Sequence, residues 1–119
     1  MRNGTLLAAL DLGSNSFRLE IGRHEKGLIE RVEYLKETVR QGAGLDENNV
    51  LSQEAMQRGW ECLERFKERL AGFRKEQIRA IGTQTLRQAV NRDVFVAQAR
   101  EILGVPVDVV SGREEARLI

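Results

Sequence analysis

The chain has 119 residues, enough for one domain with a buried core, and its formal net charge of +1 provides no bulk attraction to DNA, RNA or a membrane surface. A single cysteine, Cys62, excludes an internal disulfide, and no Cys/His cluster suggests a zinc site. The sequence contains neither a signal-peptide core nor an apolar run of the roughly 18 residues that a membrane span needs, so we expect a cytoplasmic protein.

The first three expected elements are strands of an antiparallel meander. Residues 6–10 are apolar without alternation, which is typical of a strand buried on both faces. Residues 17–21 alternate apolar and polar side chains, so they form a half-buried strand with Arg18 on its polar face. Residues 24–27 form the next turn, and residues 28–39 read as a longer, mostly polar strand.

A helix follows the meander after a loop over residues 41–49. Ser52 is its expected N-cap, and Leu51 with Met56 has the spacing of a hydrophobic staple. Apolar side chains then recur at helical spacing as far as Phe73. One face of this helix should therefore dock on the sheet.

The remaining elements alternate between strands and helices. A short strand at residues 78–81 precedes one or two helical turns around residues 86–90. Asn91 is the expected N-cap of a longer helix that ends at Gly104, and residues 105–110 form another strand.

A final helix should begin at Ser111, because Ser111 and Glu114 have capping-box spacing. The order is β-β-β-α-β-α-β-α, and the later strands should be parallel because helices connect them. This indicates the α/β class, with a mixed sheet and an RNase H-like order of elements. Nothing in the sequence stops the last helix before Ile119, so we expect residues 1–119 to be a single N-terminal domain of a longer multi-domain protein.

Polar residues gather in the segment DLGSNSF, directly after the first strand. Gly13 lets the backbone of this turn approach a ligand closely, and consecutive N–H groups there can bind an anion. Ser14, Asn15 and Ser16 add neutral hydrogen-bond donors. Arg18 offers a fork suited to phosphate, and Asp11 is placed to hold a hydrated metal ion. The alternative interpretation is a hairpin with ordinary Asx and Ser turns.

Two later segments also follow expected strands. In GTQTLR, the hydroxyl of Thr83 and the guanidinium of Arg87 could bind an anion at a helix N-terminus; alternatively, Thr83 caps the helix and Arg87 is solvated. In SGREEAR, the capping role of Glu114 leaves Glu115 to act as a general base on water, if it faces the strand ends. The alternative there is an acidic first turn favoured by the helix dipole.

Four blocks together resemble the exopolyphosphatase and guanosine pentaphosphate phosphatase family, within the actin-like, sugar-kinase-like ATPase superfamily. In chain order they are DLGSNSFRLEI, AGLDENNVLSQEAMQRGWECLERFKERL, GTQTLRQAV and SGREEARLI. The resemblance implies two RNase H-like domains that face each other across a cleft, of which this chain matches the first. A second phosphate loop of the Asp-x-Gly-Gly-Gly-Ser-Thr type is absent, which supports a longer parent. We expect that parent to supply the second domain and to form a homodimer.

The resemblance also implies roles for individual residues, in an enzyme that removes a terminal phosphate with Mg²⁺ as the usual metal. Glu115 falls on the family glutamate that orients or deprotonates the attacking water. Asp11 and residues 13–16 fall on the first phosphate loop.

Three matches outside that loop concern Arg18, Thr83 and Arg87. Arg18 falls where some members carry a phosphate-binding arginine, whereas close bacterial members often have histidine followed by methionine at that place. Thr83 and Arg87 match the family's GT-x-x-x-R block near the cleft.

Two substrates fit the family. The segments WECL and EILGVPV resemble the guanosine pentaphosphate branch, whereas GTQTLRQA and the loops are closer to the exopolyphosphatase branch. We expect release of terminal phosphate from polyphosphate, with hydrolysis of pppGpp to ppGpp as the alternative. Two alternatives from other classes are a non-catalytic phosphate-binding module and a structural domain whose turns happen to carry polar side chains. Glu115 argues against pure anion binding, which gains nothing from a nearby carboxylate.

Overall fold

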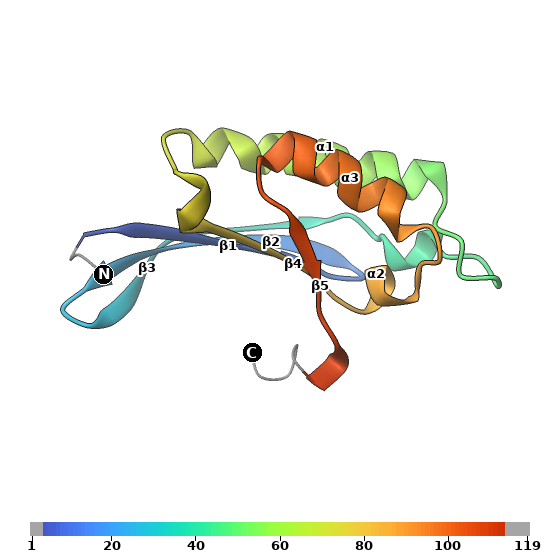
Figure 1. Cartoon of the computed structure of the whole chain (residues 1–119), viewed down its shortest axis with the longest axis horizontal. Helices are drawn as coiled ribbons and strands as arrows, with labels where there is room; N and C mark the ends of the chain where they lie inside the picture. The colour runs from blue at the N-terminus through green and yellow to red at the C-terminus, as the bar shows by residue number, and fades with distance from the viewer. Residues whose placement is uncertain (1–3, 114–119) are drawn as a thin grey trace.

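The computed structural model describes residues 4–113 and contains a five-stranded mixed sheet with its two longer helices on one face (Figure 1). The strands are β1 (Leu6–Leu12), β2 (Ser16–Glu25), β3 (Leu28–Thr38), β4 (Ile78–Gly82) and β5 (Val107–Val109). They lie in the order β3-β2-β1-β4-β5. The first three pair antiparallel, whereas β4 is parallel to β1 and β5 is parallel to β4. The predicted meander and the predicted parallel strands are both confirmed.

Three α-helices and three short 3₁₀ turns connect the strands. The helices are α1 (Gln53–Lys67), α2 (Gln84–Gln88) and α3 (Arg92–Leu103), and the 3₁₀ turns are Gly42–Gly44, Glu68–Leu70 and Lys75–Gln77. Helices α1 and α3 contact each other and lie along the same face of the sheet, while α2 sits at one end of it (Figure 1). In the described part of the chain, no helix is long and apolar enough to cross a membrane.

Aromatic side chains fill the core between the sheet and the two long helices. Phe17 of β2 and Phe95 of α3 are fully buried and meet edge to face, with ring centroids 6.3 Å apart. Trp60 of α1 stacks on Phe95 at 5.8 Å, and its indole N–H donates to the Phe95 carbonyl at 3.1 Å. These contacts join α1, α3 and the sheet into one core, as the helical spacing of Trp60 predicts.

Helix α1 begins as predicted but ends early. The Ser52 hydroxyl accepts a hydrogen bond from the Ala55 N–H at 3.1 Å, which confirms the N-cap. The α-helix stops at Lys67, and residues 68–70 tighten into a 3₁₀ turn. Gly72, with a φ of +87°, then redirects the chain, so the prediction of one helix as far as Phe73 is wrong in its last turns.

Asn91 is the N-cap residue of α3, as predicted, but its side chain makes no cap hydrogen bond. Its Oδ1 accepts from the Leu51 N–H at 2.9 Å, and its Nδ2 donates to the Leu51 carbonyl at 3.0 Å. The amide therefore joins the start of α3 to the residue before the N-cap of α1. Strand β5 is also shorter than the predicted range 105–110, and residues 112 and 113, after Ser111, are helical.

Candidate functional site

A small open pocket of about 190 Å³ lies where β1 and β4 end. Ligands of open α/β sheets often bind outside the carboxyl ends of parallel strands, and β1 and β4 are parallel neighbours that both end here. The predicted site residues that line the pocket are Asp11, Gly13, Ser14, Asn15, Ser16, Arg18 and Thr83. Lys36 and Gln84, which the sequence analysis missed, line it as well. The structure thus brings the DLGSNSF and GTQTLR segments to one place.

In the turn after β1, two carbonyl groups are engaged in hydrogen bonds and, among the described residues, two N–H groups are free. The Ser14 carbonyl accepts from the Gly42 N–H at 2.8 Å. The Asn15 carbonyl accepts from the N–H groups of Val39 at 3.0 Å and Arg40 at 2.8 Å. Within residues 4–113, the N–H groups of Ser14 and Asn15 make no hydrogen bond. Successive N–H groups without carbonyl competition are suited to bind an anion.

The φ of Gly13 is not positive, so its backbone angle does not explain the glycine. Close packing does. The Gly13 N–H donates to the Ser16 carbonyl at 3.1 Å, and a Cβ at Gly13 would lie only 2.9 Å from that oxygen. Any larger residue would force the turn to shift. Ser16 is 4% exposed, and its hydroxyl oxygen is buried without a hydrogen-bond partner among the described residues.

Two cationic side chains stand on neighbouring strands beside the turn. Arg18 of β2 is in register with Asp11 of β1, and its guanidinium lies 3.5 Å from the Asp11 carboxylate. Lys36 of β3 is in register with Arg18 on the other side. The Asp11–Arg18 pair is partly exposed, so it contributes little stability, but it keeps the guanidinium next to the pocket.

Among residues 4–113, Asp11 is the carboxylate that lines the pocket. Mg²⁺ keeps several of its waters and is commonly bound by one or two carboxylates together with substrate phosphates. A single aspartate beside an anion-binding turn fits that pattern. In the part of the chain that the structure describes, no group of three or more His, Cys, Asp or Glu side chains gathers to form an all-protein metal site.

Thr83 is the N-cap residue of α2, as in the alternative interpretation, but Arg87 is not simply solvated. Thr83 is 3% exposed and makes no side-chain cap bond, and its Oγ1 lies 3.5 Å from the Leu12 carbonyl. Arg87 donates from Nη1 to the Val110 carbonyl at 2.7 Å, so it lies outside the pocket and holds the chain that leads toward residue 115. Glu115 itself lies outside the described residues.

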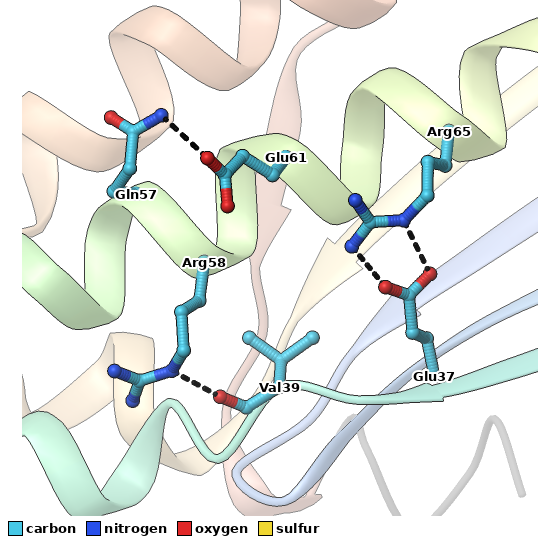
Figure 2. A network of polar contacts seen from close by, with 6 residues as sticks. All are labelled: Glu37, Val39, Gln57, Arg58, Glu61 and Arg65. Atoms are coloured by element: carbon cyan, nitrogen blue, oxygen red, sulfur yellow. Dashed lines mark hydrogen bonds and ion pairs between the residues drawn. The ribbon is translucent and has the colours of Figure 1, made fainter.

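A second polar cluster joins the end of β3 to α1, as Figure 2 shows. Arg65 donates to both carboxylate oxygens of Glu37, and these hydrogen bonds lower the pKa of the Glu37 carboxyl. Burial, followed by the nearby Glu37 charge, raises the pKa of the Cys62 thiol to about 12. Cys62 therefore stays a neutral thiol at physiological pH and is no candidate nucleophile.

Comparison with known sequences places these features in a family. A sequence profile of the Ppx/GppA phosphatase family matches residues 20–119. The guanosine-5'-triphosphate,3'-diphosphate pyrophosphatase of Vibrio atlanticus is 54% identical over 114 residues, which are 96% of this chain and 23% of that protein. The protein of the same name from Vibrio vulnificus is 53% identical over 117 residues, 98% of this chain and 24% of that one. The chain thus spans about a quarter of the length of these curated relatives.

Solved structures agree on the fold. An exopolyphosphatase-like protein matches with a TM-score of 0.90 and 30% identity, over 98% of this chain and 36% of that one. An exopolyphosphatase from Cytophaga hutchinsonii matches with a TM-score of 0.88 and 26% identity, over 97% and 37%. A Ppx/GppA protein from Aquifex aeolicus, at 24% identity and a TM-score of 0.86 over 95% and 37%, shares the same architecture. The chain belongs to the Ppx/GppA phosphatase family.

Proposed function

We propose that this chain is the first domain of a longer phosphatase that hydrolyses the 5' terminal phosphate of pppGpp and releases ppGpp. The observation that supports phosphate binding is the turn after β1, in which the N–H groups of Ser14 and Asn15 are free among the described residues while their carbonyls accept hydrogen bonds from elsewhere. The choice of substrate rests on the two Vibrio relatives, whose names specify guanosine 5'-triphosphate 3'-diphosphate. Their names favour this alternative over polyphosphate, which the sequence analysis preferred.

The pocket provides complementary charge for a terminal phosphate. The N–H groups of Ser14 and Asn15 donate to its oxygens, and Arg18 and Lys36 supply positive charge from adjacent strands. Like charges directly opposite each other across a strand pair repel, and an anion between them offsets that repulsion. Bound at Asp11, Mg²⁺ would neutralise part of the charge on the phosphate oxygens.

The chemical step is in-line attack of water on the terminal phosphorus. Glu115 takes a proton from the water as it attacks, the bond from phosphorus to the bridging oxygen breaks, and ppGpp leaves with that oxygen. Arg87 supports this arrangement indirectly, because it holds the Val110 carbonyl five residues before Glu115. The second RNase H-like domain closes the other side of the cleft.

The experiment that tests the function is phosphate release by the parent protein, extended beyond Ile119, from pppGpp and from long-chain polyphosphate in parallel. We expect Mg²⁺-dependent release with a larger kcat/KM for pppGpp. A larger value for polyphosphate would restore the exopolyphosphatase reading, which the names of two solved structures favour. No release from either substrate by a folded protein would contradict the hydrolase and leave a binding module.

A matched pair of substitutions tests the general base. Glu115→Gln should lower kcat by about 10²- to 10⁴-fold, the usual contribution of a positioned general base, without changing the melting temperature. Glu114→Gln changes the neighbouring carboxylate, which has the capping-box position, and should lower stability slightly while leaving kcat within about twofold of the parent value. Equal kcat values for the two variants would contradict the assignment of Glu115.

A further inference from the structure

We propose that Thr85 is a positioning residue whose buried hydroxyl orients the Ser14 hydroxyl toward a bound phosphate, a role that rests on the proposed function. Thr85 lies in the first turn of α2 and is 2% exposed. Its Oγ1 and the Ser14 Oγ lie 2.7 Å apart and are hydrogen-bonded. The bond joins two residues that are 71 positions apart, so it connects the turn after β1 directly to the segment after β4.

Either hydroxyl can donate this bond, and a bound phosphate determines which one does. A hydroxyl donates one hydrogen and accepts through its lone pairs, whereas a phosphate oxygen without a proton only accepts. When Thr85 donates to Ser14, the hydrogen of the Ser14 hydroxyl is left to point elsewhere. Ser14 lines the pocket, and its N–H is free within the described residues. Ser14 can therefore offer both its N–H and its O–H to one anion.

Contacts with Gly42 and Thr85, which do not line the pocket, hold Ser14 in place. The Gly42 N–H donates to the Ser14 carbonyl at 2.8 Å. A Cβ at Gly42 would lie 3.2 Å from the Thr85 Oγ1 and 3.3 Å from the Ser14 Cβ. Gly42, Thr85 and Ser14 thus pack closely, and a methyl group at Gly42 would require its neighbours to shift by a few tenths of an ångström. Neither the carbonyl nor the hydroxyl of Ser14 can turn away without losing a hydrogen bond.

This arrangement also distinguishes Thr85 from Thr83, its neighbour in the family block. The Thr83 hydroxyl lies 3.5 Å from the Leu12 carbonyl and the residue lines the pocket. Thr85 does not line the pocket, so it acts on a ligand only through Ser14. Its removal should consequently affect phosphate affinity only while Ser14 retains its hydroxyl.

The test uses the parent protein with Thr85→Val, which keeps the shape but not the hydroxyl, and Thr85→Ser, which keeps the hydroxyl. We measure KM and kcat for phosphate release from pppGpp, and the Kd of tripolyphosphate by calorimetry in the presence of Mg²⁺. Thr85→Val should raise KM and Kd about tenfold with kcat within about twofold, because one hydrogen bond to a charged ligand is weakened. Thr85→Ser should restore both constants to within about twofold of the parent values.

A double-mutant cycle with Ser14→Ala separates positioning from plain structural support. Thr85→Val should change the tripolyphosphate Kd by less than about twofold in the Ser14→Ala background, because the two side chains act as one unit. A lower melting temperature with an unchanged Kd would overturn the proposal, as would an equal loss of affinity in both backgrounds. If Thr85→Val does not fold, Thr85→Ala carries the same expectation.

The two proposals fail in different ways. A parent protein that binds tripolyphosphate in a Thr85-dependent manner but releases no phosphate contradicts the phosphatase and keeps the positioning role. A protein that releases phosphate with an unchanged KM in Thr85→Val keeps the phosphatase and contradicts the positioning role. A protein that neither binds nor releases phosphate overturns both.

Discussion

Two turns join neighbouring antiparallel strands in this sheet, and they are built in opposite ways. Between β2 and β3, Lys26 and Gly27 have φ values of +52° and +80°, and a Cβ at Gly27 would meet nothing within 4 Å. Between β1 and β2, residues 13–15 include no positive φ, and Gly13 is packed against the Ser16 carbonyl. The β2–β3 turn is therefore a short loop of the left-handed type that tight hairpins favour.

The difference lies in where the stabilising contacts come from. The β2–β3 turn depends on its own backbone angles. The β1–β2 turn is held by hydrogen bonds from residues 39–42 and from Thr85, which belong to other parts of the chain. Because those contacts occupy the Ser14 and Asn15 carbonyls, the N–H groups of the same two residues are left available for a ligand. A turn held by long-range contacts and carrying free donors is thus suited to bind a ligand, while the locally determined turn has the features of a connection.

The largest expected effect comes from giving each turn the same extra methyl group. Gly13→Ala places a Cβ 2.9 Å from the Ser16 carbonyl, so the turn must move. We expect kcat/KM of the parent protein to fall about a hundredfold, the cost of roughly 1 Å of misplacement in a site. Gly27→Ala, at a φ of +80°, should instead cost about 1 kcal/mol of unfolding free energy with activity unchanged. Similar losses of activity in the two variants would contradict the distinction.

Arginines on α1 provide a second, smaller test of the support behind the β1–β2 turn (Figure 2). Arg58 donates to the carbonyls of Val39 at 2.9 Å and Arg40 at 3.1 Å, and the N–H groups of these two residues hold the Asn15 carbonyl. Arg58→Met should lower the unfolding free energy by about 1–2 kcal/mol and weaken tripolyphosphate binding about threefold to fivefold.

Arg65→Met is the control for that substitution. It removes a partly exposed ion pair with Glu37, so it should cost less than about 1 kcal/mol and leave tripolyphosphate binding unchanged. Denaturant unfolding and calorimetry on the two variants make the comparison. Weaker binding in Arg65→Met, or full affinity in Arg58→Met, would show that the connection from α1 to the turn does not matter.

Most of the fold was predictable from sequence because its signals are local. Alternating side chains located β2, the apolar run located β1, and Ser52 marked the start of α1. The early end of α1 was not predictable in this way, since residues 68–70 continue the helical pattern and Gly72 is the first residue that breaks it. Local signals therefore find elements better than they find the ends of elements.

The parts of the site that sequence analysis missed depend on contacts between distant residues. Asn91 has the local composition of an N-cap, but its amide binds Leu51, 40 positions earlier. Lys36 reaches the pocket because it is in register with Arg18, and register between strands is not encoded in either strand alone. The role of Thr85 likewise exists only because α2 places it against Ser14. The family resemblance located the turn, whereas its supports required the structure.

Removing one positive charge at each end of the β2–β3 hairpin tests how much Lys36 contributes to phosphate binding. Lys36→Gln takes a cation from the pocket, while Lys26→Gln takes one from the connecting turn. We expect Lys36→Gln to weaken tripolyphosphate binding about twofold to fivefold, the size of an exposed ion pair, and to reduce the dependence of Kd on salt. Lys26→Gln should change neither quantity, and a shift of Kd in that variant would indicate a nonspecific effect of net charge.

The smallest expected effect concerns the two ends of β3. Near the site, Glu37 is hydrogen-bonded by Arg65, and its pKa is lowered from the ordinary value of 4.5. A lowered pKa in the folded state contributes stability above the pKa of the unfolded chain, and that contribution disappears as the pH falls through the folded value. Glu37→Gln should therefore lose less than about 1 kcal/mol at pH 7, and the loss should vanish in acid.

Glu30→Gln, near the connecting turn, is the matched control for Glu37→Gln on the same strand. Glu30 is exposed and makes no ion pair within the described residues. Denaturant unfolding of both variants from neutral to acid pH should show a pH-dependent difference from the parent only for Glu37→Gln. An equal dependence at both positions would mean that the acid response reflects general charge repulsion. A difference confined to Glu37 would show that the ion pair with Arg65 holds β3 to α1 at the end next to the pocket, with no equivalent contribution from Glu30 at the other end. The two ends of β3 would then differ in the same way as the two turns: one is held by distant residues and the other is not.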